Sequence, residues 1–466
     1  MTINRLKNIF VIFLVCLAAF QTTQLWFDSF SNRNFFYTVF PSGNNGAAAM
    51  DSQGRTIATP YRIFVGLSDK TFTIKYNHLI DSPQKEQGDE ALRLILKNGV
   101  FVSVAAPDYA TIFKNRTLVY DYAFAIPSDA FAQGLGENAT NLTGKIKDFT
   151  TVVLSAEKSS GRINCFFLTR ENNEPVCYLY TIVKNTACTA LADAIDAYSG
   201  YDSTHSLTYA SSKLFGYTLF QNNVFIAQVP DTGYTYRPLM VSNPYAVSDG
   251  LFLSSVEKKI DFLFENPLSK LHDTINNVFT YRDDNTVVKY YPNNVLEYTS
   301  YWPSTSEKSA SLAMDCSAAY AFLAKDKEIG NEYFLSGYEE GEGYREFCFD
   351  YAVDDLPLIL PDSFRAEHDI TMSHPLVVRV EYGRVFRYAK LAYVFSENPE
   401  EERVATTDFL SSANAVLGSQ EGENGQAIWP TDAVLGYRID AGKDLMLYWF
   451  MYINGKMHAQ SAQQSR

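Results

Sequence analysis

The chain has 466 residues, and its 46% apolar content is enough to bury more than one hydrophobic core. Its net charge of −14 and pI near 5.0 exclude a nucleic-acid-binding protein, because phosphate contacts need a basic stripe and the sequence contains none. Tyrosine, phenylalanine and tryptophan make up 15% of the residues, which favours a sheet-rich protein with few helices.

The first predicted element is a membrane anchor over residues 9–27. The segment follows Arg5 and Lys7, and positive residues stay on the cytoplasmic side of a membrane. As a helix it would be roughly 28 Å long, close to the thickness of the hydrocarbon layer. The residues that mark its apolar stretch and its aromatic end are Ile9, Phe20, Leu25, Trp26 and Phe27. We therefore predict a single transmembrane helix, with residues 1–8 in the cytoplasm and residues 28–466 outside the cell membrane.

The alternative is a secretory signal peptide, since the strictly apolar stretch 9–20 has the length of a signal-peptide core. A cut after Ala18 or Ala19 would place Cys16 or Leu17 at the −3 position, where a small residue is preferred. The retained anchor is the better interpretation of this segment.

Two pairs of small residues lie four apart in the anchor, Ala18 with Thr22 and Ala19 with Thr23. This spacing places them on one side of a helix, where another membrane helix can approach closely. They are candidate helix–helix contacts, although small residues also occur in membrane helices without such a role.

The exterior part is predicted to be an α+β, multidomain assembly of helices combined with antiparallel sheets. An N-terminal domain (28–148) contains strands at 61–65, 71–76 and 117–125, and a helix at 128–135. A middle domain (149–302) contains strands at 150–154, 163–168 and 176–183, helices at 186–198 and 249–264, and a meander at 278–282, 286–291 and 295–301.

A C-terminal domain (303–466) repeats the plan of a helix followed by strands. Its predicted elements are a helix at 304–325, strands at 332–338, 344–351, 376–386 and 388–395, a helix at 407–417 ending at Gly418, and a hairpin of 434–439 with 445–453. The polar tail from residue 456 is expected to be loose.

The residues that usually carry chemistry form no catalytic or metal-binding pattern. Five cysteines lie outside the anchor at scattered positions, which is not a disulfide framework, although a bridge between Cys165 and Cys177 is left open. The nearest approach to a metal cluster is Glu367, His368 and Asp369 with His374, and we interpret these as loop residues. We expect a protein without catalytic, metal or cofactor residues.

Several segments resemble the YycH (WalH) family of single-pass exterior regulators of the WalK/WalR (YycG/YycF) cell-wall two-component system in Gram-positive bacteria. They are the anchor, the strand at 60–63, the turn at 124–127 and, above all, FLFENPLSKL (262–271) and FTYRDDNTVVKYYPNNVLEY (279–298). The positions that match the family motif are Phe264, Asn266, Pro267, Leu296, Glu297 and Tyr298. The strand at 344–351 and the closing hairpin are similar to the last domain of that family, which its companion YycI shares.

The resemblance implies a regulatory protein that is not an enzyme and that contacts a sensor histidine kinase (WalK/YycG-like) and a YycI-like companion. Those contacts would involve the membrane helix and the exterior domains, and a homodimer is left open. The alternative is an extracytoplasmic ligand-binding or envelope-assembly module with no kinase partner. Glu297 and Tyr298 either end a strand, with Tyr298 packed and Glu297 exposed or paired with a base, or mark an interaction edge.

Overall fold

The structure is a computed structural model that describes most of the chain beyond residue 53. The described residues are 54–66, 71–75, 82–138, 140–198, 207–217, 219–220, 222–229, 234–245, 252–301, 310–419, 430–439, 444–453 and 455–463. The predicted anchor (9–27) and its candidate contact residues lie outside them. No helix of the described residues is long and apolar enough to cross a membrane.

The first large sheet is antiparallel throughout and collects strands from a long stretch of the chain. Its strands are β1 (Arg62–Gly66), β2 (Thr71–Lys75), β3 (Val100–Ala105), β4 (Arg116–Pro127), β5 (Asp148–Glu157), β6 (Arg162–Glu171), β7 (Glu174–Val183), β8 (Thr208–Ser211) and β9 (Phe225–Gln228). Their spatial order is β3-β7-β6-β5-β4-β1-β2-β8-β9, so β3 and β9 are the edge strands.

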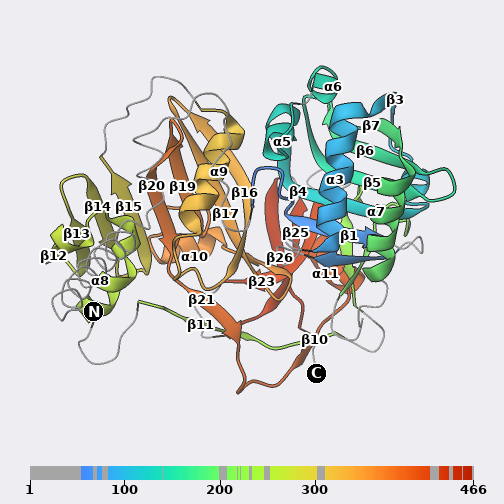
Figure 1. The fold of residues 1–466 in the computed structure, drawn as a ribbon. Coiled ribbons are helices and arrows are strands. Elements are labelled where there is room, and N and C mark those ends of the chain that lie inside the picture. Colours follow the sequence, from blue (N-terminus) through green and yellow to red (C-terminus); the bar gives the residue numbers. More distant parts are fainter. Residues whose placement is uncertain are drawn as a thin grey trace, which may run out of the picture. The chain divides into compact units, whose positions relative to one another are not determined.

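A long helix that the sequence analysis missed packs on this sheet. Helix α3 (Pro83–Asn98) begins where the Ser82 side chain accepts a hydrogen bond from the Lys85 N–H, and Pro83 occupies its first turn. Leu92, Ile95 and other apolar residues of α3 are buried. Figure 1 shows α3 beside α7 (Asn185–Ala197), which matches the predicted helix at 186–198, and both lie across one face of the sheet. The shorter helices of this part are α4 (Tyr109–Ile112), α5 (Ser128–Gly134) and α6 (Thr140–Thr143).

The second large sheet takes its strands from the remainder of the chain. They are β12 (Leu271–Ile275), β13 (Val278–Arg282), β14 (Thr286–Tyr290), β15 (Val295–Ser300), β16 (Glu332–Gly341), β17 (Tyr344–Val353), β18 (Leu356–Ile359), β19 (Leu376–Glu381), β20 (Arg384–Leu391), β23 (Pro430–Arg438), β25 (Leu447–Ile453) and β26 (Lys456–Ser461). Their order is β12-β13-β14-β15-β20-β19-β17-β18-β23-β25-β26, and β16 pairs with β17. Of these pairs, β18 with β23 is parallel.

Helices cover one face of this sheet. Helix α9 (Leu312–Leu323) begins at a cap in which Ser311 accepts from the Met314 N–H, and it buries Cys316, Ala319 and Leu323. Within the described residues, which do not include 302–309, the helix predicted at 304–325 begins at Leu312. The predicted helix at 249–264 is α8 (Phe252–Lys259) followed by the short 3₁₀ helix η3 (Asp261–Leu263). The remaining helices are η4 (Pro267–Ser269), α10 (Asp362–Glu367) and α11 (Phe409–Ser419), which continues through Gly418.

Two C-terminal expectations were wrong. The single strand predicted at 376–386 is two strands, β19 and β20, because Tyr382 and Gly383 have φ of 49° and 82° and form a tight turn. The tail predicted to be loose from residue 456 is strand β26, which pairs with β25 over Lys456–Ser461. Backbone pairing with a buried neighbouring strand compensates for its polar composition.

The described residues show the sheet-rich α+β class that the sequence predicts. Two smaller sheets complete it, one of β10 (Thr235–Tyr236) and β22 (Val404–Ala405), the other of β21 (Val394–Glu397), β11 (Leu239–Ser242) and β24 (Asp444–Leu445).

Residues 48–466 form one compact unit, within which the ring of Tyr61 lies 4.4 Å from that of Phe334. The first sheet has strands on both sides of residue 148 and the second on both sides of residue 302, and the division into the three predicted domains stays a prediction.

Candidate interaction surface

Exposed apolar side chains gather at an edge strand of each large sheet. Around β12 the exposed fractions are 96% for Leu268, 64% for Leu271 and 63% for Ile275. On β3 three valines are half exposed or more, at positions 100, 102 and 104. Apolar groups that cluster on a surface are a mark of contact sites, so these two edges are the candidates for binding another molecule.

The segment that leads into β12 contains three residues of the predicted motif. Phe264 is buried at the end of η3. Asn266 caps η4, because its side chain accepts a hydrogen bond of 3.2 Å from the Leu268 N–H, and Pro267 occupies the first turn of that helix. Lys270 then pairs with Asp261. These contacts fix the direction in which the chain enters β12.

β12 and β13 form a hairpin that the sequence analysis did not identify. Its two-residue turn is Asn276-Asn277, with φ of 53° and 63°. Positive φ at both central residues is the mark of a type I′ turn, and asparagine tolerates it better than most residues do. The alternation in Leu-His-Asp-Thr-Ile before two asparagines is the signal that could have revealed this hairpin.

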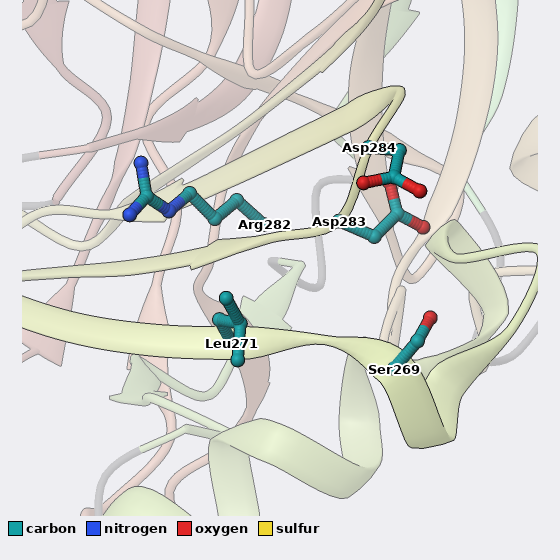
Figure 2. Close-up of a pocket in the computed structure, with 5 residues that line it drawn as sticks. All are labelled: Ser269, Leu271, Arg282, Asp283 and Asp284. Atoms are coloured by element: carbon teal, nitrogen blue, oxygen red, sulfur yellow. The ribbon is translucent and has the colours of Figure 1, made fainter.

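A pocket of about 280 Å³ lies where β12 begins. It is lined by Ser269, Leu271, Arg282, Asp283 and Asp284, and Figure 2 shows Ser269 and the two aspartates toward one end, with the Arg282 side chain directed away from the aspartates. One oxygen of Asp283 accepts hydrogen bonds of 2.9 Å from the Asn285 N–H and 2.7 Å from the Thr286 N–H. That carboxylate therefore shapes the turn between β13 and β14.

The other three motif residues lie on β15, on alternating faces of the sheet. Leu296 is fully buried, and the ring of Tyr298 lies 5.4 Å from that of Phe322 on α9. Glu297 points to the opposite face, where its carboxylate accepts hydrogen bonds of 3.0 Å from Arg387 and 2.9 Å from the Tyr291 hydroxyl. Burial is the main cause that raises the pKa of Tyr291 to about 12, and the Glu297 carboxylate adds to it.

A buried polar cluster lies next to Leu296, on the face that the helices cover. Lys390, the cross-strand neighbour of Leu296, donates a hydrogen bond of 2.6 Å to Asp326, which also accepts one of 2.8 Å from the Tyr388 hydroxyl. Burial lowers the pKa of Lys390 and raises that of Tyr388. The Lys390 ammonium also lies 5.0 Å from the ring centre of Tyr245. These groups are enclosed, and the bond between Lys390 and Asp326 connects the turn after α9 to the sheet.

Among the described residues, His374 has a charged partner and the cysteines are buried. His374 lies 2.9 Å from Asp350. In the described ranges, no group of three or more histidine, cysteine, aspartate or glutamate side chains could hold a metal ion. Cys165 and Cys177, between which a bridge was left open, are free and buried, as are the other described cysteines, Cys188, Cys316 and Cys348.

No protein-family model matches the sequence, and no curated protein matches it. Among solved structures, the chain is similar to YycH from Bacillus subtilis, with a TM-score of 0.50 and 11% identity over 88% of this chain and 97% of that chain. It is also similar to an uncharacterized protein from Eubacterium rectale ATCC 33656, with a TM-score of 0.35 and 9% identity over 52% of this chain and 89% of that chain. The first comparison extends over nearly the whole of both chains, and we conclude that this chain has a YycH-like fold.

Proposed function

We propose that this protein is a membrane-anchored, extracytoplasmic regulator that acts on a sensor histidine kinase of a two-component system by protein–protein contact. The observation that carries the proposal is the YycH-like fold, which extends over 88% of the chain. A fold can host several functions, so the function must also be argued from the local features of the surface.

The anchor is part of the proposal. Residues 9–27 would cross the cell membrane once, with the N-terminus in the cytoplasm and the sheets outside, because Arg5 and Lys7 precede the apolar segment. The small residues Ala18, Ala19, Thr22 and Thr23 would then face a membrane helix of the kinase or of a YycI-like companion.

The described surface supports contact as the mode of action. Its most exposed large apolar side chain, Leu268, lies beside Leu271 and Ile275 at an open sheet edge. The buried ionisable groups Lys390 and Asp326 are engaged with each other. Regulation without catalysis is the function that agrees with both features.

Co-purification tests this proposal. The chain of residues 1–466 is expressed in its own host with an affinity tag, and a sensor kinase is expected to co-purify from detergent-solubilised membranes. Exchange of residues 1–27 for an unrelated single-pass anchor should reduce the yield of kinase, as should the double substitution Ala19→Leu, Thr23→Phe. The matched control is Leu17→Phe, which adds bulk to the same helix on the side opposite the two pairs of small residues.

Two results would contradict the proposal. One is a mature chain found in the culture medium with its first residues removed, which would mean that the segment is a signal peptide. The other is the absence of any kinase from the purified native chain, which would favour the ligand-binding or envelope-assembly alternative.

A further inference from the structure

We propose that β12 binds an extended segment of a partner protein as an additional strand, and that this segment carries a basic residue with an apolar residue two positions away on each side. The inference rests on the proposed function, because it names the chemistry of the partner at the contact surface.

The edge of β12 is open to an incoming strand. Within the described part of the chain β12 pairs with β13 alone, in a continuous register from Leu271↔Arg282 to Ile275↔Val278. All five of its residues are exposed. The strand contains no proline, lysine or bulge, which are among the features that protect a free edge, and Asp273 is its one acidic residue. Its outward-facing backbone groups belong to His272 and Thr274, and the Thr274 N–H donates to the Asp273 carboxylate. An incoming strand would take over that N–H and leave the carboxylate to pair with a basic residue.

The side chains of β12 define what the new strand must carry. Leu271, Asp273 and Ile275 occupy alternate positions and point to one face, so the acid stands between two exposed apolar residues. On the inner side Asp273 is opposite Thr280, which is neutral. No ion pair of the described residues includes Asp273, whose carboxylate accepts a hydrogen bond from the N–H of the next residue.

A partner residue opposite Asp273 would lie within about 5.5 Å, measured between Cβ atoms. Opposite charges at such positions attract, and apolar residues favour apolar neighbours across the strands. Because side chains alternate with a period of two, the pattern apolar-x-basic-x-apolar matches β12 in either strand direction.

A second copy of the chain matches this edge poorly. Antiparallel pairing of β12 with itself about a two-fold axis through its centre would place Asp273 opposite Asp273 of the other copy, and like charges directly opposite are destabilising. Each copy also carries a net charge of −14. Strand β3 has no charged residue, but a register shift between Phe101 and Ser103 interrupts it, and such a bulge turns an edge away from regular pairing.

Peptide binding tests the inference on the chain of residues 1–466. The probes are two cyclic hairpin peptides with the outer strand Ile-Thr-Lys-Thr-Ile or Ile-Thr-Glu-Thr-Ile, in which the strand is already formed so that little ordering is needed on binding. We expect the lysine peptide to bind about tenfold more tightly, since attraction is replaced by repulsion at one cross-strand pair. Bound peptide should also slow amide hydrogen exchange in residues 271–275.

Charge reversal at the same position provides the decisive comparison. Asp273→Lys should make the glutamate peptide the tighter ligand, and Asp273→Asn should remove most of the difference. The matched control is Glu174→Lys, which makes the same change in net charge at an exposed position on β7 and should leave the preference unchanged.

Equal affinity for both peptides, no binding of either, or exchange protection confined to residues outside β12 would overturn the inference. Its failure can be told from that of the proposed function. A chain that co-purifies a kinase but does not distinguish the peptides contradicts strand addition alone, and a chain that distinguishes the peptides but retains no kinase contradicts the kinase proposal alone.

Discussion

Lys390 and Asp326 form an ion pair of 2.6 Å in which the two side chains are 1% and 0% exposed. The second oxygen of Asp326 accepts a hydrogen bond of 3.0 Å from the Glu328 N–H, and the Tyr388 hydroxyl donates to the first. A single carboxylate therefore connects the turn after α9 to two residues of β20. Lys390 is the cross-strand neighbour of Leu296, so the pair lies at the junction of β15 and β20.

Removal of the lysine charge should destabilise the protein strongly. Lys390→Met leaves Asp326 buried without its counter-ion, and breaking a buried pair in this way costs about 3–5 kcal/mol. Urea unfolding followed by circular dichroism measures the free energy of unfolding. The double variant Lys390→Met, Asp326→Leu should recover part of the loss, because it leaves no isolated charge.

Lys158→Met is the matched control for that experiment. Lys158 pairs with Asp193 and Asp196 on the surface, where solvent screens the charges, so its removal should leave the unfolding curve nearly unchanged. Equal effects of the Lys158 and Lys390 substitutions would contradict the assignment of a buried structural pair.

His374 should make stability depend on pH. Burial lowers the pKa of His374, but the hydrogen bond and charge of Asp350 outweigh burial and raise it above its usual value of 6.5. Arg365 opposes this shift and Glu339 adds to it. A raised pKa means that the folded state holds the proton more tightly, so the stabilisation is complete below pH 6.5 and is lost as the pH rises through the folded-state pKa.

The measurement is the difference in melting temperature between the native chain and His374→Gln from pH 5 to pH 9. The difference should be largest at the acidic end and should shrink as the pH rises. His272→Gln serves as the control for the loss of a histidine ring, because His272 is exposed and makes no ion pair within the described residues. A difference for His374→Gln that grows with pH would contradict the pairing with Asp350.

The C-terminal strand should be required for stability. Removal of residues 454–466 deletes β26, whose backbone pairs with β25 from Tyr448↔Ser461 to Ile453↔Lys456. The loss of this ladder at about 0.5–1.5 kcal/mol for each hydrogen bond should cost about 3 kcal/mol or more. It would also expose the edge beside Trp449, Phe450 and Met451, so light scattering should reveal aggregation.

A shorter truncation separates the strand from the rest of the tail. Removal of residues 464–466 leaves β26 complete and should leave both the unfolding midpoint and the scattering unchanged. If the longer truncation behaves like the shorter one, β26 does not contribute to the folded state.

The thiols beyond the anchor should be unreactive in the native state. Burial raises the pKa of Cys177 and of Cys348 to about 12, and it raises that of Cys165 well above its usual value. In a Cys16→Ser background, Ellman's reagent at pH 8 should therefore label almost no thiol until denaturant is added, because the thiolate is the reactive form.

Denaturation should then release five thiols, one for each free cysteine of the described residues. Dithiothreitol should not shift the unfolding midpoint. A count of three thiols under non-reducing conditions would instead show that one disulfide has formed.

Local patterns predicted the elements that are defined by their own turns. The meander β13–β14–β15 was predicted correctly because turn residues such as Asp283 and Asn294 separate short runs of strand-forming residues. The β4–α5 junction was also predicted, since Pro127 marks the point where the strand ends and the helix begins. The miss at α3 was avoidable, because Ser82 and Pro83 are a helix-start signal.

Other features depend on residues that are distant in sequence. The polar segment 456–461 is a strand because β25 offers it a complete set of backbone partners. The run at 376–386 becomes two strands because each half finds its own place in the sheet, with Tyr382 accepting a positive φ at the turn. The composition of these two segments predicts neither the strand at 456–461 nor the turn within 376–386.

By itself, the sequence determined the sheet-rich class and most element positions, because alternation, caps and turn residues act over a few positions. The tertiary structure alone decided that β12 is an edge strand among the described residues and that Lys390 meets Asp326 across 64 residues of chain. Which edge stays unpaired and which charge is buried depend on how every strand is ordered in the sheet, and hydrophobic burial fixes that order collectively.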